Sequence, residues 1–246
     1  MTLRLCHLYP RELNIYADRG NIAVFAKRLE WRGLSLDVVE VELGDPLPTD
    51  CGVYYLGGGQ DRDQAVVADD LRRGKAADLA RVVDDGAVVL AVCGGYQLAG
   101  HGYTGVDGRR MEGIALLDAD TVAGRTRLIG DLVIDAELDG EHQLVVGFEN
   151  HAGRTRLGPK ARPLGRVVSG NGNNGEDGGE GAVQGRIVGT YLHGPLLPKN
   201  PWLADRLIAW GLERAGGDRR RLDPIDDSLE ESAHAAAVAR ARHPRR

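Results

Sequence analysis

Short apolar runs recur along the first hundred residues, and each has the length of a strand. They lie at Leu3–Tyr9, Leu34–Leu43, Val53–Leu56 and Ala87–Val92. The last of these runs contains no polar residue, which is typical of a central parallel strand that is covered on both faces. We therefore predict a strand at each run, with Ala87–Val92 in the middle of the sheet.

The stretches between these runs have helical character. In Asn14–Arg32 apolar side chains recur at helical spacing, and Gly33 suits the cap that ends a helix. Gln60–Asp85 is charged and alanine-rich with one apolar face, which indicates one or two surface helices. Strands separated by helices predict an α/β fold with a mostly parallel central sheet flanked by helices and with its chemistry at the carboxyl ends of the strands.

The chain changes character beyond Gly113, where β-type segments follow one another with few helical stretches between them. These segments are 128–138, 143–149, 163–169 and 182–192. They predict a β-rich C-terminal half that forms an antiparallel extension or edge within the same domain. Ser169–Gly181 is too polar and Gly-rich to pack by this interpretation, so we expect a flexible hairpin loop there.

The C-terminal part divides into a helix and a charged tail. Pro201–Ala215 has the pattern of a closing helix. The length of 246 residues suits one α/β core, so we predict a single domain over residues 1–215. Residues 216–246 form a charged tail that we expect to be partly helical, with frayed final residues.

Composition narrows the range of partners. The formal net charge is -5 and the pI is near 5.8, which disfavours binding to nucleic acid or to an anionic membrane. No long apolar run or leader pattern is present, so we expect a soluble, cytoplasmic protein without a transmembrane segment. Cys6, Cys51 and Cys93 have no paired spacing, which predicts neither a disulfide framework nor a metal site.

Cys93 stands where the apolar run Ala87–Val92 meets Gly94-Gly95-Tyr96-Gln97. A cysteine between small residues on a strand-to-helix turn resembles a nucleophile elbow, and the helix N-terminus favours the thiolate. An isolated cysteine at a strand end is more often an inert core residue, but the glycines that follow Cys93 favour the catalytic interpretation. Cys6 and Cys51 lack such surroundings and receive no chemical role.

A thiol nucleophile needs a base and donors for an oxyanion. His193 ends a β-type run and enters a Gly-Pro turn, so it is our candidate base. His151 is the runner-up, although it could equally brace a turn. The backbone amides of Gly94 and of Gly58, within the triplet Gly57–Gly59, are candidate oxyanion donors, while a plain tight turn is the alternative for the triplet.

Several motifs together resemble a known family. The order of Leu56–Asp61, Cys93–Gln97 and Thr190–Pro195 resembles that of class I glutamine amidotransferases of the cobyric acid synthase type. A narrower resemblance, to the glutaminase subunits of lipid II isoglutaminyl synthases, is carried by Leu13–Ile22, Gly147–His151 and Gly194–Asn200. It implies a flavodoxin-like fold and hydrolysis of L-glutamine to glutamate and ammonia.

The resemblance also assigns residues. It implies that Cys93 is the nucleophile, that His193 is the general base and acid, and that Arg127 contacts the carboxylate of glutamine. Without the resemblance Arg127 would not be preferred over Arg125, and a solvated surface arginine would be the default. Gln97 would line the same pocket.

The partner is likewise implied by the resemblance alone. This chain would need no cofactor, and it would form a heterodimer with a MurT-like Mur ligase subunit that holds ATP and Mg. That subunit would activate the α-carboxylate of D-glutamate in the lipid II stem peptide, and ammonia from this chain would complete the amidation. The contact with lipid II would therefore be indirect.

One departure from the family pattern concerns the third member of the catalytic triad. Many class I amidotransferases have an acidic residue two positions after the histidine, where this chain has Pro195. We therefore expect a carboxylate from elsewhere, for example from the partner ligase, to orient His193. The alternatives are a non-catalytic regulatory subunit, a thiol peptidase, and a glutaminase that serves another amidation such as a cobyric acid synthase-like reaction.

Overall fold

The computed structural model describes residues 1–14, 19–216 and 222–242. A first sheet has the strand order β11-β12-β4-β3-β1-β2. Its strands are β1 Thr2–Leu8, β2 Ser35–Val41, β3 Val53–Leu56, β4 Val88–Val92, β11 Ala182–Gln184 and β12 Ile187–Thr190. All neighbours pair in parallel except β11, which pairs antiparallel with β12 at the edge. The mostly parallel α/β sheet predicted from the sequence is confirmed.

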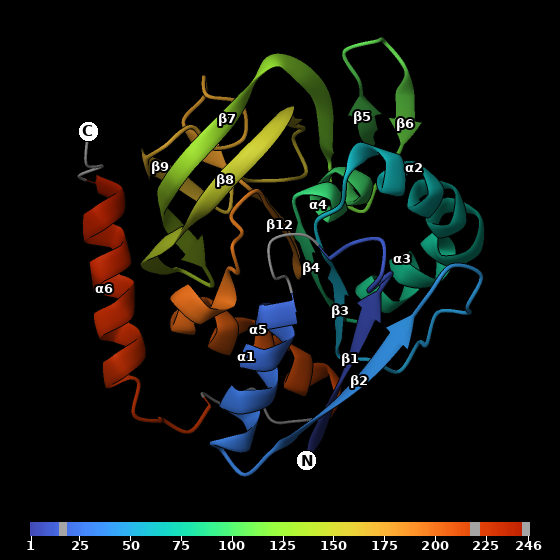
Figure 1. The fold of residues 1–246 in the computed structure, drawn as a ribbon. Coiled ribbons are helices and arrows are strands. Elements are labelled where there is room, and N and C mark those ends of the chain that lie inside the picture. Colours follow the sequence, from blue (N-terminus) through green and yellow to red (C-terminus); the bar gives the residue numbers. More distant parts are fainter. Residues whose placement is uncertain (15–18, 217–221, 243–246) are drawn as a thin grey trace.

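Helices cover both faces of this sheet, as Figure 1 shows. They are α1 Arg19–Glu30, α2 Asp61–Asp70, the π-helix η1 Leu71–Lys75, α3 Ala76–Asp84, α4 Gly94–Ala99, the short 3-10 helix η2 Leu197–Lys199 and α5 Pro201–Arg214. The last helix, α6 Ser228–Arg242, packs on a second sheet instead. Successive side chains of a strand point to opposite faces, so Leu5 of β1 packs with α1 and α5, whereas Cys6 packs with α2, η1 and α3. The sheet is therefore buried on both sides.

A second sheet lies beyond the carboxyl ends of the first (Figure 1). Its strands are β5 Gly102–Thr104, β6 Arg110–Glu112, β7 Ala119–Leu138, β8 Glu141–Leu157, β9 Gly165–Ser169 and β10 Gly179–Glu180. The long strands β7 and β8 pair antiparallel, with a register shift between Ala123 and Leu128. The predicted β-rich half therefore contributes the longest strands of this second sheet, and through β12 it also supplies a parallel strand next to β4 in the first.

The tail folds back onto the second sheet. Helix α6 packs through Val238 and Ala241 against β7 and β8 (Figure 1). Before it, Asp227 accepts a hydrogen bond of 2.7 Å from Nη1 of Arg28, whose Nε donates over 2.6 Å to Asp205 of α5. The expected frayed end, residues 243–246, lies outside the described residues, as do residues 15–18 of the predicted first helix.

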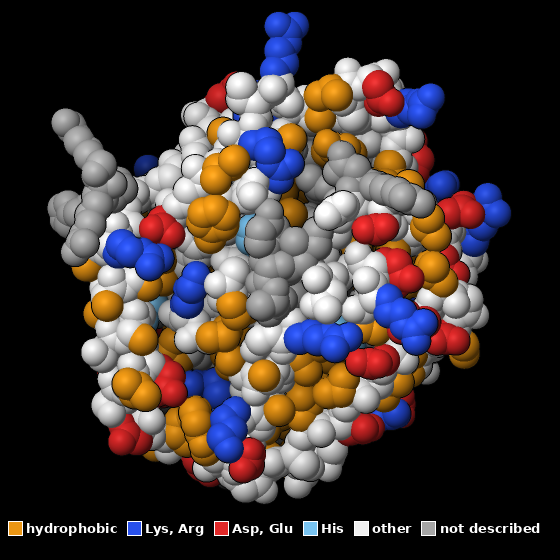
Figure 2. Space-filling view, viewed as in Figure 1, with side chains coloured by type: hydrophobic (Ala, Val, Ile, Leu, Met, Phe, Trp, Pro, Cys, Tyr) orange, Lys and Arg blue, Asp and Glu red, His pale blue; other side chains and the backbone are white. Residues whose placement is uncertain are grey.

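The surface carries charges of both signs, interspersed over the face that Figure 2 shows. No large field of one sign is visible on that face, in keeping with the small net charge. No helix in the described part of the chain is long and apolar enough to cross a membrane.

Candidate active site

Cys93 occupies a strained turn between β4 and α4. Its φ is 51°, in the left-handed region that a side chain rarely adopts. Its backbone N–H donates over 2.8 Å to the carbonyl of Thr190 on the neighbouring strand. The thiol is only partly buried, and α4 begins at the next residue, so the positive end of the helix faces the sulfur-bearing turn. This is the geometry of a nucleophile elbow.

The glycine triplet after β3 packs directly against this elbow. The N–H of Gly95 donates to the carbonyl of Gly57 over 3.0 Å. A Cβ added to Gly94 would lie 2.9 Å from the backbone nitrogen of Gly59, and a Cβ added to Gly95 would lie 2.6 Å from the carbonyl oxygen of Leu56. Only glycine permits this approach, so the two segments proposed to hold an oxyanion, with Gly58 and Gly94, adjoin each other.

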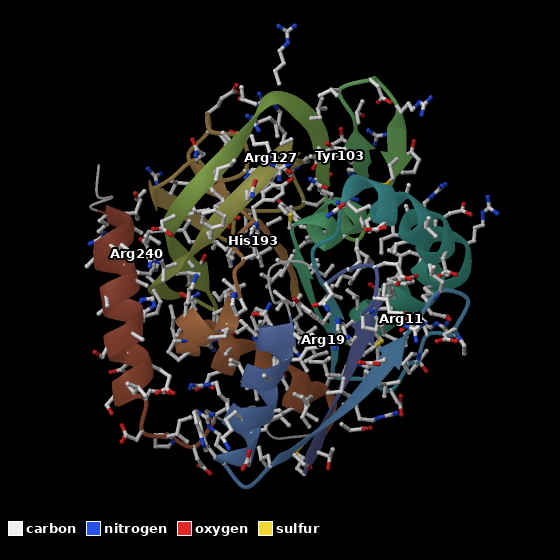
Figure 3. The ribbon with its side chains drawn as sticks, in the orientation of Figure 1. Arg11, Arg19, Tyr103, Arg127, His193 and Arg240 are labelled. Atoms are coloured by element: carbon white, nitrogen blue, oxygen red, sulfur yellow. The ribbon has the colours of Figure 1, made fainter. Side chains whose placement is uncertain are left out.

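His193 reaches the same edge of the sheet from β12. Thr190 of β12 is paired with Val92 of β4, and His193 follows three residues later. Its backbone forms two hydrogen bonds of 3.0 Å with Phe148 of β8. Its side chain is buried, with 1% exposed. The histidine therefore sits where the first sheet meets the second, and Figure 3 shows it in this central position.

The surroundings of His193 favour a neutral imidazole. Burial is the main cause that lowers its pKa to about 4. The charges of His151, Lys199 and Arg127 lower the pKa further, and the charge of Glu149 opposes them. At neutral pH the ring can therefore accept a proton from a thiol, but it is a weak base in this state.

His151, the runner-up base, is used structurally. Its ring stacks on Tyr191 with centroids 3.6 Å apart and planes 4° apart. Its Nδ1 lies 2.9 Å from the carbonyl oxygen of Gly153, and its Nε2 lies 3.7 Å from a carboxylate oxygen of Glu149. These contacts support the bracing role that the sequence left open for His151.

The segment Ser169–Gly181 does not behave as predicted, because it is packed. Both carboxylate oxygens of the buried Glu149 accept hydrogen bonds from it: Oε1 accepts from the backbone and side chain of Asn171, each over 2.8 Å, and Oε2 accepts from the Gly172 N–H over 3.0 Å. Asn173 is 1% exposed and exchanges two hydrogen bonds with the backbone of Gly181. The prediction of a flexible loop was wrong because distant partners satisfy its polar groups.

Glu180 is a second buried carboxyl group that sequence reasoning missed. It accepts the backbone N–H of Tyr191 over 2.7 Å and the hydroxyl of Thr190 over 3.1 Å. Burial raises its pKa to about 8. Glu180 therefore holds the backbone that leads to His193. The sequence signal for this role was the position of Glu180 just before the strand pair β11 and β12.

Gln97 lies one helical turn after Cys93 and is 6% exposed. Its Nε2 donates to the hydroxyl of Tyr191 over 3.2 Å. That hydroxyl lies 2.8 Å from the Thr155 hydroxyl, which lies 2.7 Å from the Thr121 hydroxyl. Gln97 thus belongs to a buried polar chain between α4 and the second sheet, and its substrate contact stays a prediction.

Arg127 lies on β7 inside the register shift between Ala123 and Leu128, and it is exposed. Its Nε and Nη2 donate to the side chain and the carbonyl of Asn150 over 2.7 and 2.6 Å. Figure 3 shows Arg127 above His193 in this view. Its charge contributes to lowering the pKa of His193. Arg127 is therefore a cation at the edge of the candidate site.

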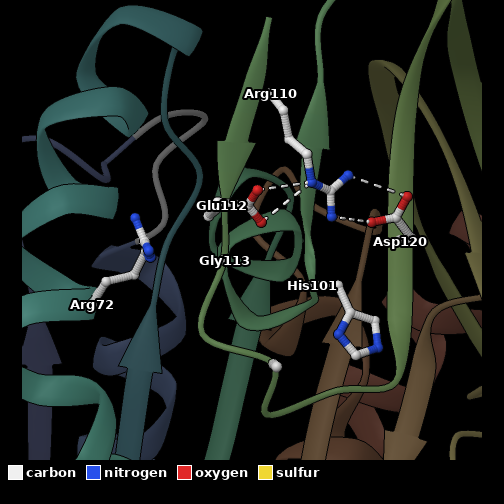
Figure 4. Close-up of a pocket in the computed structure, with 7 residues that line it drawn as sticks. Arg72, His101, Arg110, Glu112, Gly113 and Asp120 are labelled. Carbon is white, nitrogen blue, oxygen red and sulfur yellow. Dashed lines mark hydrogen bonds and ion pairs between the residues drawn. The ribbon is translucent and has the colours of Figure 1, made fainter.

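A separate hollow of about 720 Å³ lies between η1 and the β5–β6 hairpin (Figure 4). It is lined by Arg72, His101, Arg110, Glu112, Gly113, Ala115 and Asp120. It shares none of the residues proposed above. Arg110 already pairs with Asp120 over 2.8 Å and with Glu112 over 3.1 Å. The hollow therefore adds nothing to the candidate chemistry at Cys93.

Comparisons with known proteins show the family of this chain. A family model described as the CobB/CobQ-like glutamine amidotransferase domain matches residues 4–201. The elbow, the histidine and this match define a glutamine amidotransferase of the CobB/CobQ-like class. A solved structure, PurLQS from Thermotoga maritima, has the same fold with a TM-score of 0.54 at 18% identity, covering 87% of this chain and 98% of that one.

Two curated relatives narrow the family. The lipid II isoglutaminyl synthase (glutamine-hydrolyzing) subunit GatD of Staphylococcus aureus is 40% identical over 87% of this chain and 86% of that protein. The subunit of the same name from Streptococcus pneumoniae is 39% identical over 93% of this chain and 88% of that protein. The chain belongs to the family of these GatD subunits, and the resemblance carried by the sequence motifs is confirmed.

Proposed function

We propose that Cys93 hydrolyses the side-chain amide of L-glutamine with His193 as general base and acid. The observation that carries this proposal is that Cys93 directly follows β4 and His193 follows β12 by three residues, at the carboxyl ends of two adjacent parallel strands. The hydrogen bond from the Cys93 N–H to Thr190 joins the two strand ends. Parallel α/β sheets place their chemistry at this edge. The strained φ of 51° presents the Cys93 side chain above it.

The proposed cycle has two halves. The Cys93 thiolate attacks the amide carbon, the backbone amides of Gly58 and Gly94 bind the oxyanion, and protonated His193 gives its proton to the departing nitrogen. Ammonia leaves and a glutamyl thioester remains. A water molecule activated by His193 then cleaves the thioester and releases glutamate. No metal ion or organic cofactor in this chain takes part.

Arg127 and Gln97 are the proposed contacts with the rest of the substrate. The exposed guanidinium of Arg127 offers a bidentate partner to the α-carboxylate of glutamine. Its present bonds to Asn150 support this role because they hold the planar group in one orientation. Gln97 would line the inner wall, behind the turn that carries Cys93.

The ammonia is proposed to serve a separate ligase. The GatD relatives are named as subunits of lipid II isoglutaminyl synthase. By this likeness, the partner would be a MurT-like Mur ligase in the cytoplasm, which uses ATP and Mg to activate D-glutamate of the lipid II stem peptide. The two chains would form a heterodimer, and this chain would meet lipid II only through its partner.

The low pKa of His193 supports dependence on that partner. A base with a pKa of about 4 removes a thiol proton poorly at neutral pH. Pro195 stands where many relatives of this class carry an acidic residue, and Glu149 is already bonded to Asn171 and Gly172. A carboxylate from the docked ligase beside His193 would raise the pKa of the imidazole and orient it.

The test is glutamate release from glutamine by the wild-type chain and by Cys93→Ala, each alone and co-expressed with the ligase subunit. We expect release in the complex, much slower release from the chain alone, and no release with Cys93→Ala. Cys51→Ala is the matched control, because Cys51 is buried before the start of β3, at the opposite end of that strand from the Gly57–Gly59 turn. Release that survives Cys93→Ala would refute the mechanism, and equal release with and without the ligase would refute the partner dependence.

A further inference from the structure

Gln64 lies in the first turn of α2, directly against the elbow that carries Cys93. Its side chain is 2% exposed. Its Nε2 donates to the carbonyl of Gly59 over 2.8 Å. A Cβ added to Gly94 would lie 2.7 Å from that Nε2 and 3.0 Å from the Cδ of Gln64. The amide group of Gln64 is therefore in contact with both segments that are proposed to hold the oxyanion.

The carbonyl oxygen of this side-chain amide, Oε1, has no hydrogen-bond donor among the described residues. The oxygen is buried as well. Buried polar atoms in folded proteins are nearly always bonded, so an acceptor left open beside a reactive residue calls for an explanation. The amide orientation is decided by the bond to Gly59, because a carbonyl oxygen can accept only from Nε2.

We propose that Gln64 is a specificity-determining residue that accepts an N–H of the substrate carboxamide through Oε1, while Nε2 holds the Gly57–Gly59 turn in position. This inference rests on the proposed role of Cys93 as nucleophile. A carboxamide placed on Cys93 has its carbonyl oxygen at the backbone amides of Gly58 and Gly94. Its NH₂ group then needs an acceptor, and the Gln64 amide group, which carries Oε1, lies against Gly94 through its Nε2 and Cδ.

A hydrogen bond to Oε1 would distinguish the substrate from the product. The glutamine side chain ends in an NH₂ group with two N–H donors, whereas the glutamate side chain at neutral pH ends in a carboxylate with none. An acceptor at Oε1 therefore binds the substrate and repels the product.

The test compares two substrates in the complex with the ligase subunit. L-Glutamine donates N–H groups at the reacting carbon, and the γ-methyl ester of L-glutamate has none. Gln64→Met removes both the acceptor and the donor, whereas Gln64→Glu retains an acceptor and removes the donor to Gly59. Gln143→Met, at an exposed position of β8, is the matched control.

For Gln64→Met we expect kcat/KM to fall for both substrates, because the Gly57–Gly59 turn loses the hydrogen bond from Nε2. We expect kcat/KM for glutamine to fall about fivefold to tenfold further than that for the ester, which is the effect of one neutral hydrogen bond. For Gln64→Glu we expect equal losses on both substrates, within about twofold. Gln143→Met should match the wild type. An unchanged ratio of glutamine to ester in Gln64→Met would leave Gln64 with a structural role only and overturn the proposal.

A second measurement needs no Gln64 variant, so it holds even if those variants fail to fold. In the Cys93→Ala complex, glutamine should bind about fivefold or more tightly than the γ-methyl ester, and equal dissociation constants would overturn the proposal. The two levels of failure are distinguishable. Hydrolysis that persists in Cys93→Ala removes the proposed nucleophile, whereas Cys93-dependent hydrolysis with an unchanged substrate ratio removes only the role of Gln64.

Discussion

Replacing Glu180 with glutamine should change how stability depends on pH. The folded-state pKa of Glu180 is about 8, above the ordinary value of 4.5, because the carboxyl is buried. Its protonated form is therefore favoured by folding, and the associated stability is complete below pH 4.5 and is lost as pH rises through 8. Each pH unit within this window lowers the free energy of unfolding by about 1.4 kcal/mol.

The interval from pH 6.5 to 8 isolates this group. His7 and His193 have pKa values lowered to about 4, so their contribution to stability rises with pH only up to the ordinary value of 6.5. Above pH 6.5, Glu180 is the one group of these three that still binds a different number of protons in the folded and the unfolded state. The wild type should lose about 1.5–2 kcal/mol between pH 6.5 and 8.

Glu180→Gln should abolish that loss. Its side-chain oxygen can still accept from Tyr191 and Thr190, so activity at pH 7 should remain close to that of the wild type. Urea unfolding at half-unit pH steps measures the slope, and Glu176→Gln, an exposed glutamate of the same loop, is the control that should keep it. A variant whose stability falls with pH as steeply as that of the wild type would refute the assignment of this proton to Glu180.

Two further substitutions test the packing and the proposed substrate contact. Gly95→Ala should destabilise the chain by about 1–3 kcal/mol in urea unfolding and suppress glutaminase activity, because its Cβ would meet backbone oxygens at 2.6 and 2.9 Å. Gly74→Ala is the control: it has open space around it, so its free energy of unfolding should be unchanged or slightly higher. Arg127→Met should raise KM for glutamine about tenfold or more with a smaller effect on kcat, while Arg125→Met should change neither constant. Steady-state kinetics of the complex measure both constants, and a fall in kcat with an unchanged KM in Arg127→Met would contradict the proposed substrate contact.

Much of the fold followed from local patterns. The run Val53–Leu56 is a strand with the predicted bounds, and Pro201–Ala215 forms a helix that ends one residue earlier than expected. Such segments are predictable because an apolar run covered on both faces, or an apolar stripe at helical spacing, specifies its own structure with little help from distant residues. The turn at Cys93 is equally local, since small neighbours alone permit it.

The polar loop Ser169–Gly181 shows where local reasoning ended. Its composition is that of a solvated hairpin, yet the distant Glu149 accepts hydrogen bonds from Asn171 and Gly172 of the loop in the interior. Composition reports whether a segment can bury apolar surface, but it does not report whether distant donors and acceptors will meet its backbone. Only the tertiary structure placed these partners together.

The sequence by itself determined that this chain is a parallel α/β protein with a thiol on a strand-to-helix turn, and its motifs identified the glutamine amidotransferase family. The tertiary structure decided which polar residues surround that thiol: it buried Glu180 behind the strand that leads to His193, set Gln64 beside Gly94, and left Arg127 exposed on a bulged strand. The physical reason is the distance along the chain over which each kind of interaction acts. Strand and helix signals act between neighbours in the chain, whereas burial, pKa shifts and hydrogen bonds between side chains depend on residues that only folding brings together.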